Sequence, residues 1–92
     1  MQVTVEYLGQ LGHLAGRGEE TLEAAEGQGL AALLADAAER HGEEFRAIVL
    51  DDAGAPRPSL MVLVNEAPVD KARTPALNDG DRVTLLAAIA GG

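Results

Sequence analysis

The fold of this chain is decided by its last segment, which reads Leu77-Asn78-Asp79-Gly80-Asp81-Arg82-Val83-Thr84-Leu85-Leu86-Ala87-Ala88-Ile89-Ala90-Gly91-Gly92. Residues 78–81 favour a tight turn, because Asn and Asp side chains bond to nearby backbone and Gly tolerates positive φ. Residues 82–89 follow as a mostly apolar stretch that predicts a strand. This last strand and the first strand of the chain are both candidates for central positions in a sheet, and a last strand that lies centrally projects the C-terminus outward from the sheet.

Three more strands are indicated upstream of this segment. Apolar residues alternate along residues 3–8, which is typical of a half-buried strand. Residues 20–24 form a weaker strand, and the four glycines within residues 9–18 indicate a loop between the two, so we expect an N-terminal hairpin. Residues 60–64 are apolar at every position, which predicts a strand covered on both faces.

One main helix is predicted between the hairpin and the later strands. Its apolar stripe recurs at helical spacing and consists of Leu30, Leu33, Leu34, Ala37 and His41. Gly42 stands where a helix end is expected, whereas Gly29 is a poor residue for the start. Residues 43–50 favour a further helical turn, and residues 51–58 a turn-rich connection. The element order predicts an α+β fold, a mixed β-sheet packed on one main α-helix.

The composition is that of a small acidic domain. The 92 residues are 47 % hydrophobic, which is enough for one core, so we expect a single domain over residues 1–92. Seven Lys+Arg against 15 Asp+Glu leave a net charge of −8, and only Tyr7 and Phe45 are aromatic, which argues against nucleic acid as a partner. The absence of Cys excludes a thiol nucleophile and a Cys-based metal site. No membrane-length apolar run or signal peptide is present, so we expect no membrane partner and a cytoplasmic protein.

Four segments, in order and spacing, resemble those of the ubiquitin-like β-grasp sulfur carriers, and most of all the small-subunit family of molybdopterin synthase; the thiamine-pathway carriers are more distant. The segments are Tyr7-Leu8-Gly9-Gln10-Leu11 with Leu14-Ala15-Gly16, then Val62-Leu63-Val64-Asn65, then Leu77-Asn78-Asp79-Gly80-Asp81-Arg82-Val83, and finally Ile89-Ala90-Gly91-Gly92. One departure is Ala87-Ala88, where family members often carry proline, so a less stiff tail is expected. The resemblance implies a ubiquitin-like β-grasp fold.

The resemblance also implies a carrier that is not an enzyme. In the family, an adenylating enzyme of the ubiquitin-activating type uses ATP to activate the C-terminal carboxyl group, and a sulfur donor then converts that group to a thiocarboxylate. Gly92 would be adenylated and carry the sulfur. Ile89, Ala90 and Gly91 would enter the partner's active site as part of a flexible tail over about residues 88–92. Two residues without a Cβ suit a narrow channel.

Apolar residues in two strands suggest a surface that docks partners. They occupy both faces of their strands, and a single helix covers only one face; the residues are Leu60, Met61, Leu63, Leu85 and Leu86. Loops such as residues 43–58 are one possible cover for the second face. The resemblance favours the alternative, an exposed patch that docks the large synthase subunit and the activating enzyme.

The resulting prediction is a sulfur carrier, most specifically the small subunit of molybdopterin synthase in molybdenum cofactor biosynthesis. The chain itself is expected to bind no cofactor and no metal. The alternatives are a sulfur carrier for thiamine, cysteine or tRNA thiolation, a ubiquitin-like modifier joined to lysines through Gly92, or a plain interaction module.

The remaining polar candidates are interpreted as structural. His13 and His41 are too few for a metal site without further ligands, so each is expected to be a satisfied or a surface residue. The acidic pairs fit no calcium-loop spacing and no set of acid and base partners, and are expected to be solvated surface: Glu19-Glu20, Glu43-Glu44 and Asp51-Asp52.

Overall fold

Five strands form one sheet in the computed structural model, which describes residues 1–73 and 75–87. In chain order, the elements are β1 (Gln2–Tyr7), α1 (Gln10–Ala15), β2 (Glu19–Glu23), α2 (Leu30–His41), α3 (Glu43–Val49), β3 (Leu60–Val64), β4 (Ala67–Pro68), the short 3-10 helix η1 (Lys71–Arg73) and β5 (Arg82–Ala87). The strand order in the sheet is β2-β1-β5-β3-β4. The last strand, one of the two candidates for a central position, therefore lies in the middle.

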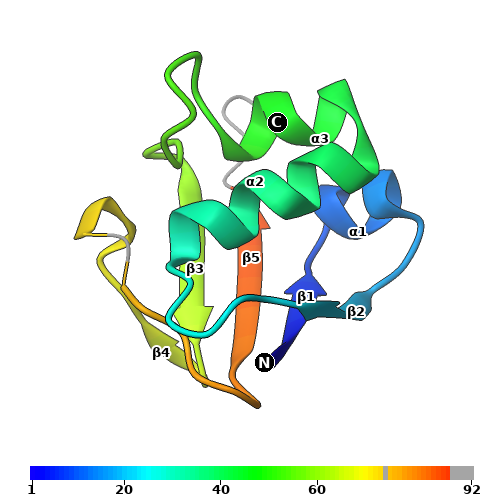
Figure 1. Ribbon diagram of the computed structural model, residues 1–92. Coiled ribbons are helices and arrows are strands. Elements are labelled where there is room, and N and C mark those ends of the chain that lie inside the picture. The colour runs from blue at the N-terminus through cyan, green and yellow to red at the C-terminus, as the bar shows by residue number, and fades with distance from the viewer. Residues whose placement is uncertain (74, 88–92) are drawn as a thin grey trace.

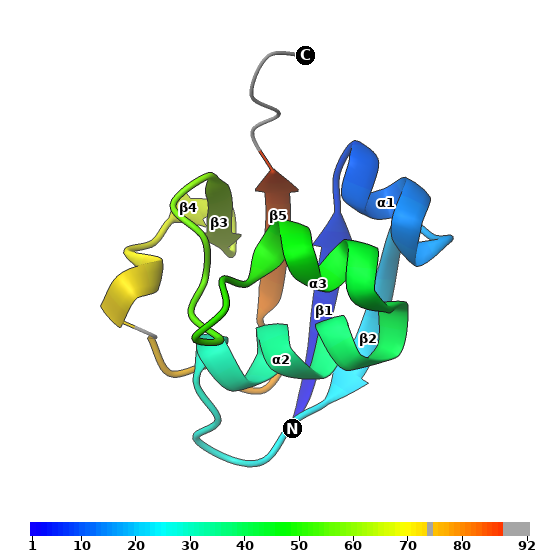
Figure 2. The same cartoon turned by 90° about the horizontal axis from the view of Figure 1, so that it is seen from above.

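The pairing makes the sheet mixed. β1 runs antiparallel to β2 and parallel to β5, while β3 runs antiparallel to β5 and to β4. Figure 1 shows β1, β3 and β5 side by side, with α2 and α3 crossing over one face of the sheet. The same layers are visible from above in Figure 2. The predicted N-terminal hairpin and the α+β arrangement are confirmed.

The core lies between this sheet and the main helix. The helix stripe faces it, since Leu30, Leu33, Leu34 and Ala37 are fully buried. α3 adds Phe45 and Val49, and the strands contribute Val3, Val5, Leu22, Leu60, Val83 and Leu85 from their inner side. Burying large aliphatic side chains stabilises by roughly 1.5–3 kcal/mol each, so this layer is the main source of stability.

The helix α1 was not expected, because its segment is rich in glycine. Gly9 before it has φ 58° and ψ −130°, and Gly16 after it adopts the left-handed conformation, so both glycines are used where the backbone turns. Within α1, a Cβ on Gly12 would lie only 2.8 Å from the Tyr7 carbonyl oxygen. Close packing against β1 and the burial of Leu11 therefore stabilise a helix that local propensity disfavours.

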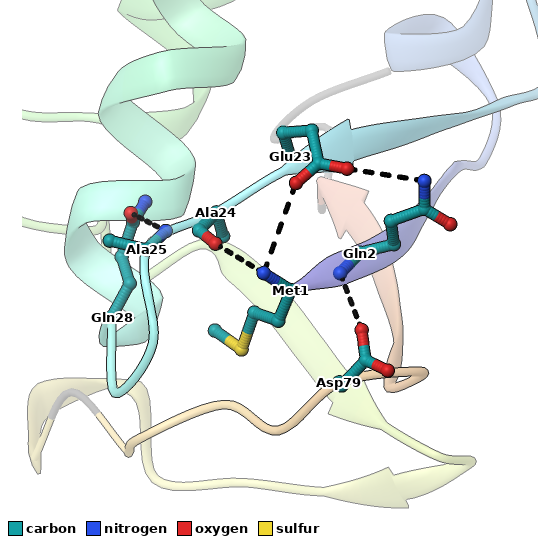
Figure 3. Close-up of polar contacts among 7 residues, drawn as sticks. All are labelled: Met1, Gln2, Glu23, Ala24, Ala25, Gln28 and Asp79. Carbon is teal, nitrogen blue, oxygen red and sulfur yellow. Dashed lines mark hydrogen bonds and ion pairs between the residues drawn. The ribbon is translucent and has the colours of Figure 1, made fainter.

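The turn before β5 also forms a hydrogen bond with the first strand. Asp79 Oδ1 accepts a hydrogen bond of 2.7 Å from the Gln2 backbone N–H, and Asp81 Oδ2 accepts one of 2.8 Å from the Asn78 N–H. Figure 3 shows the Asp79 contact together with the bond of 2.8 Å from the Met1 amine to the Ala24 carbonyl oxygen. These contacts align the parallel strands β1 and β5, and they confirm that residues 78–81 form a turn.

Two small elements, β4 and η1, lie between β3 and the turn before β5, where the sequence pattern predicted neither a strand nor a helix. Asn65 and Glu66 have φ of 52° and 71°, and this tight turn leads from β3 into β4. The Asn65 amide donates to Asp81 Oδ1 at 2.9 Å, and its side-chain oxygen accepts from the Arg82 N–H at 2.9 Å. Long-range contacts of this kind are absent from the local sequence pattern, which explains why β4 and η1 were not predicted.

Candidate functional site

The candidate site begins where the chain leaves the sheet. β5 lies between β1 and β3, and its last residue, Ala87, pairs with Leu60 at the start of β3. The predicted flexible tail, and with it four of the predicted site residues, lies outside the described residues: Ile89, Ala90, Gly91 and Gly92. The structure therefore describes the surface from which this tail departs.

Two residues predicted to dock partners belong to the core instead. Leu60 and Leu85 are both fully buried, so assigning them to an exposed patch was wrong. The reason is strand geometry, because successive side chains of a strand point to opposite faces. Leu60 and Leu85 point toward the helices, whereas their neighbours Met61 and Leu86 point to the outer face of the sheet. Loops do not cover Met61 and Leu86, since their exposed fractions are 51 % and 36 %.

Three exposed side chains form what we call the apolar row. Met61 pairs with Leu86 across β3 and β5, and Leu8 continues the row because the residue before it, Tyr7, pairs with Leu85. Leu8, Met61 and Leu86 are the exposed large hydrophobic residues of the described part of the chain. The row lies next to Ala87. Leu63, two residues after Met61 along β3, is partly exposed on the same face.

Leu8 was not predicted to belong to an exposed apolar surface, although the alternation along β1 indicates it. Val3, Val5 and Tyr7 are buried, so the period of two that predicts β1 places Leu8 on the opposite face. The sequence did not show that β1 and β5 are neighbours in the sheet. Only their parallel pairing places Leu8 next to Leu86.

Beside the apolar row lies a charged band on the same outer face. The Arg82 guanidinium is 2.8 Å from Glu19 Oε1 and 3.3 Å from Glu6 Oε2, and Thr84 Oγ1 donates to Glu6 Oε1 at 3.0 Å. The hydrogen bond to Glu19 and the negative charge of that carboxylate raise the pKa of Arg82. Two carboxylates, Glu6 and Glu19, share one guanidinium, so the charged band keeps an excess of negative charge.

On the inner side of the sheet lies a second polar group, the inner polar cluster of Tyr7, Glu20 and His41. The Tyr7 hydroxyl donates to Glu20 Oε2, and His41 Nε2 contacts the same oxygen. The Glu20 side chain is only 8 % exposed, so its assignment to solvated surface was wrong; β2 alternates, and Glu20 points inward next to Val5. His41 is a satisfied histidine, as expected, and its ring centroid lies 5.4 Å from that of Tyr7 and 5.2 Å from that of Phe45.

The contacts within the inner polar cluster shift the pKa values of Tyr7 and Glu20 in opposite directions. Burial, together with the hydrogen bond to the Glu20 carboxylate, raises the pKa of Tyr7. Burial alone would raise the pKa of Glu20, but the hydrogen bonds from Tyr7 and His41 and the nearby charges of His41 and Arg17 outweigh it, so the pKa is lowered. Glu20 is therefore held as a carboxylate that joins β2 to β1 and α2. Its contacts with Tyr7 and His41 give it a structural role.

The other acidic pairs do not converge on a ligand. Asp51 Oδ1 accepts from the backbone N–H groups of Ala53 and Ala55, both at 2.9 Å, and so closes its own loop. Glu43 and Glu44 are exposed in the first turn of α3. Within residues 1–73 and 75–87, no group of three or more His, Cys, Asp or Glu is placed to hold a metal ion. None of the helices in these ranges is long and apolar enough to cross a membrane.

Comparison with known structures supports the predicted fold. SAMP1 from Haloferax volcanii superimposes with a TM-score of 0.86 over 100 % of both chains, at 18 % identity. A Pyrococcus furiosus protein assigned as molybdopterin converting factor subunit 1 is 29 % identical, with a TM-score of 0.76 over 97 % of this chain and 99 % of that one. The chain is also similar to a structure described as the BexX/CysO complex of Amycolatopsis orientalis, at 28 % identity and a TM-score of 0.67 over 98 % and 99 % of the two chains.

The sequence comparisons agree with this likeness. A comparison with curated protein sequences gave no match. The model of the ThiS family, in contrast, matches residues 5–92, which include the apolar row, the charged band and the C-terminal Gly-Gly. Together with the mixed sheet and the helices that cover it, this match shows that the chain belongs to the ThiS family of ubiquitin-like β-grasp sulfur carriers.

Proposed function

We propose that this chain carries sulfur as a thiocarboxylate on Gly92, most specifically as the small subunit of molybdopterin synthase. The observation that carries the proposal is the family match over residues 5–92, because it extends from the first strand through the Gly-Gly end. The position of the apolar row beside Ala87 supports it, since a partner seated on this row would lie next to the segment that leads to Gly92.

The chemistry takes place on the Gly92 carboxyl group and consumes ATP on the activating partner. A carboxylate oxygen attacks the α-phosphorus of ATP, a bond to phosphorus forms, and pyrophosphate leaves. A hydrosulfide-type nucleophile then attacks the acyl carbon, a C–S bond forms, and AMP leaves with the electron pair of the broken C–O bond. The carrier contributes no catalytic side chain, in keeping with small ubiquitin-like carriers of this type, which are generally non-catalytic.

The outer face would supply the contacts for docking. Burial of Leu8, Met61 and Leu86 removes apolar surface from water, which favours association. The excess negative charge of Glu6 and Glu19 beside this row would select partners with basic residues at the edge of the contact. These two neighbouring regions would seat the adenylating enzyme and the sulfur-accepting subunit in turn.

The choice of pathway rests on the relatives. The Pyrococcus furiosus protein, at 29 % identity, favours the large subunit of molybdopterin synthase as the acceptor. The Amycolatopsis orientalis complex, at 28 % identity, makes a carrier for another sulfur-accepting enzyme the second candidate. Thiamine, cysteine and tRNA thiolation belong to that second class.

Intact-mass spectrometry tests the proposal. The chain is incubated with its adenylating enzyme, ATP and sulfide, and we expect replacement of one Gly92 oxygen by sulfur. A variant lacking Gly92 serves as the control and should not react. If the wild-type chain stays unmodified with an enzyme shown to be active, sulfur carriage is refuted. Transfer of the sulfur to the large synthase subunit would support the pathway, and transfer only to another acceptor would refute the pathway alone.

Use as a protein modifier starts from the same adenylate and leaves a distinctive trace. The nearest tryptic site before the end is Arg82, so trypsin would leave residues 83–92 on a modified lysine instead of a bare Gly-Gly. A proteomic search must therefore use this ten-residue remnant. Finding it on lysines of other proteins would establish conjugation.

A further inference from the structure

The strand β2 forms one edge of the sheet. The strand order places it at one end, with β1 as its neighbour, and Figures 1 and 2 both show it beside β1. It has five residues, whereas β4 at the opposite end has two. An edge strand presents unpaired N–H and C=O groups to which a further strand can bond. Of the two edge strands in the described sheet, β2 is therefore the one with room for another strand.

Two hydrogen bonds fix which backbone groups of β2 face β1. The Tyr7 N–H donates to the Gly18 carbonyl oxygen, and the Ala24 N–H donates to the Met1 carbonyl oxygen, both at 2.8 Å. Residues 18 and 24 therefore both face β1. Because alternate residues of an antiparallel pair bond to each other, the even-numbered residues of β2 face β1. The backbone groups that point away from the sheet belong to what we call the β2 edge: Glu19, Thr21 and Glu23.

The β2 edge is open and has defined ends. In the part of the chain that the structure describes, none of its backbone N–H or C=O groups bonds to another segment. Immediately beyond it, the Arg17 N–H donates to the Gly12 carbonyl oxygen at 3.2 Å, and the Ala25 N–H donates to Gln28 Oε1 at 3.0 Å. β2 has no proline, and its five pairs with β1 run without a bulge. The open stretch therefore fits an extended segment as long as β2 itself.

The side chains on the outer face beside this edge are acidic. Glu19 contacts the Arg82 guanidinium, which Glu6 shares, and Glu23 lies 3.8 Å from the amine of Met1. Three carboxylates thus meet two cationic groups, and the Glu23 side chain is 72 % exposed. Opposite charges on directly opposed residues stabilise a strand pair. The edge therefore favours a strand that places Lys or Arg on the outer face of the sheet.

The same charges disfavour a second copy of this chain as the occupant. A symmetric antiparallel pair of β2 strands centred on Thr21 would use all the open groups of both copies. This register places Glu19 of each copy opposite Glu23 of the other. Like charges at directly opposed positions destabilise a strand pair. A basic segment of a different protein avoids this repulsion.

We propose that the β2 edge binds an extended basic segment of a partner protein, which adds to the sheet as an antiparallel strand. Main-chain hydrogen bonds to Glu19, Thr21 and Glu23 supply affinity, and alternate Lys or Arg side chains beside the two glutamates supply specificity. Antiparallel pairing is the slightly more stable arrangement. β1 lies between β2 and β5, so this edge is separate from Leu86 and Met61 of the apolar row. The binding requires no chemistry at Gly92 and is independent of the proposed function.

A synthetic peptide tests the proposal by NMR on the labelled wild-type chain. The probe is acetyl-Lys-Val-Lys-Val-Lys-amide, and its control has glutamate in place of each lysine. We expect the lysine peptide to shift the backbone amide signals of Glu19, Thr21 and Glu23 and to slow their exchange with water, and the glutamate peptide to leave them unchanged. Absence of binding by the lysine peptide would overturn the proposal, as would shifts confined to residues outside β2.

Two backbone-methylated peptides distinguish strand addition from general attraction to an acidic protein. Peptide residues directly opposite the β2 edge turn their N–H groups toward β2 and their side chains to the outer face, so these residues are the lysines. Methylation of the lysine backbone nitrogens should therefore weaken binding by roughly tenfold. Methylation of the valine nitrogens, which point away from β2, should change it by less than about twofold. Any other ranking of the three peptides would overturn the proposal.

A matched pair of variants tests the edge from the side of the protein. Thr21→Pro removes an N–H that points away from β1, and proline is tolerated at such positions of edge strands. It should weaken binding of the lysine peptide by roughly tenfold, whereas Thr21→Val, which keeps the N–H, should bind like the wild-type chain. A folded Thr21→Pro variant with unchanged affinity would overturn the proposal. If circular dichroism shows that this variant is unfolded, the methylated peptides decide.

Discussion

Two pairs of neighbouring residues show how differently the two faces of this sheet are used. On β5, Leu85 is fully buried against the helices, while Leu86 is 36 % exposed on the outer face. On β2, the Glu20 side chain is 8 % exposed within the inner polar cluster, while that of Glu19 is 55 % exposed and pairs with Arg82 on the outer face. In each pair the two residues are of the same type and adjacent in sequence. Only the face of the sheet to which each side chain points decides whether it packs inside the fold or lies at the surface.

The outer face is therefore less constrained by packing than the inner face. Core residues are constrained by close packing, and a change in volume there is felt by the whole domain. The apolar row and the charged band carry no such constraint, because their side chains contact water on one side. Substitutions on the two faces should therefore differ in their effect on stability.

The leucine pair should give the largest contrast. Leu85→Ala is expected to lower the free energy of unfolding by about 2–5 kcal/mol, because it leaves a cavity in the core. Leu86→Ala is expected to change it by less than about 1 kcal/mol, but to weaken binding of the activating enzyme by roughly tenfold, or about 1.4 kcal/mol. Urea unfolding and titration calorimetry measure the two effects. Equal losses of stability would show that the outer face also holds the fold.

The glutamate pair should give the next contrast. Glu20→Gln is expected to cost about 1–3 kcal/mol of unfolding free energy, since it replaces a buried carboxylate that Tyr7 and His41 both contact. Glu19→Gln should have little effect, because exposed ion pairs contribute little. The same urea titrations at neutral pH decide the matter, and a larger cost at Glu19 would contradict the assignment of the two faces.

Acid should erase the contribution of Glu20. Its pKa in the folded chain lies below the ordinary value of 4.5, so its stabilisation is present above that pH and is lost as the pH falls through the folded pKa. The stability difference between the wild-type chain and Glu20→Gln should therefore be constant near neutrality and shrink below about pH 4.5. A difference that grows with acidity would mean that the carboxyl is stabilised in its neutral form.

The smallest effect on stability is expected from the charged band. Arg82→Gln removes contacts of 2.8 Å and 3.3 Å to Glu19 and Glu6 that are open to solvent, so the unfolding midpoint should hardly move. The same change exposes two uncompensated carboxylates beside the apolar row and should speed association with a basic partner at low salt. Stopped-flow association rates at several salt concentrations test this. A large loss of stability would place Arg82 among the structural residues.

Much of the fold could be predicted from local patterns. The stripe from Leu30 to His41 predicted α2, and the Asn78–Asp81 turn predicted the start of β5. In contrast, α1 was not predicted, because it is stabilised by tertiary contacts that the local sequence does not show. These are the burial of Leu11 and the close packing of Gly12 against Tyr7. Leu60, Leu85 and Glu20 were assigned to the wrong face because composition does not show which side of a strand is covered.

For the candidate site, features that depend on residues close in sequence could be predicted, and features that depend on residues far apart in sequence could not. Turn chemistry and helical periodicity are local features, and they sufficed to predict the start of the last strand and the main helix, because such signals depend on residues a few positions apart. The role expected for the Gly91-Gly92 end stays a prediction. The composition of the apolar row and the inward direction of Glu20 depend on strand pairing across more than seventy and more than ten residues, respectively. Only the packed sheet decides these, because register and coverage determine which of two opposite faces meets water.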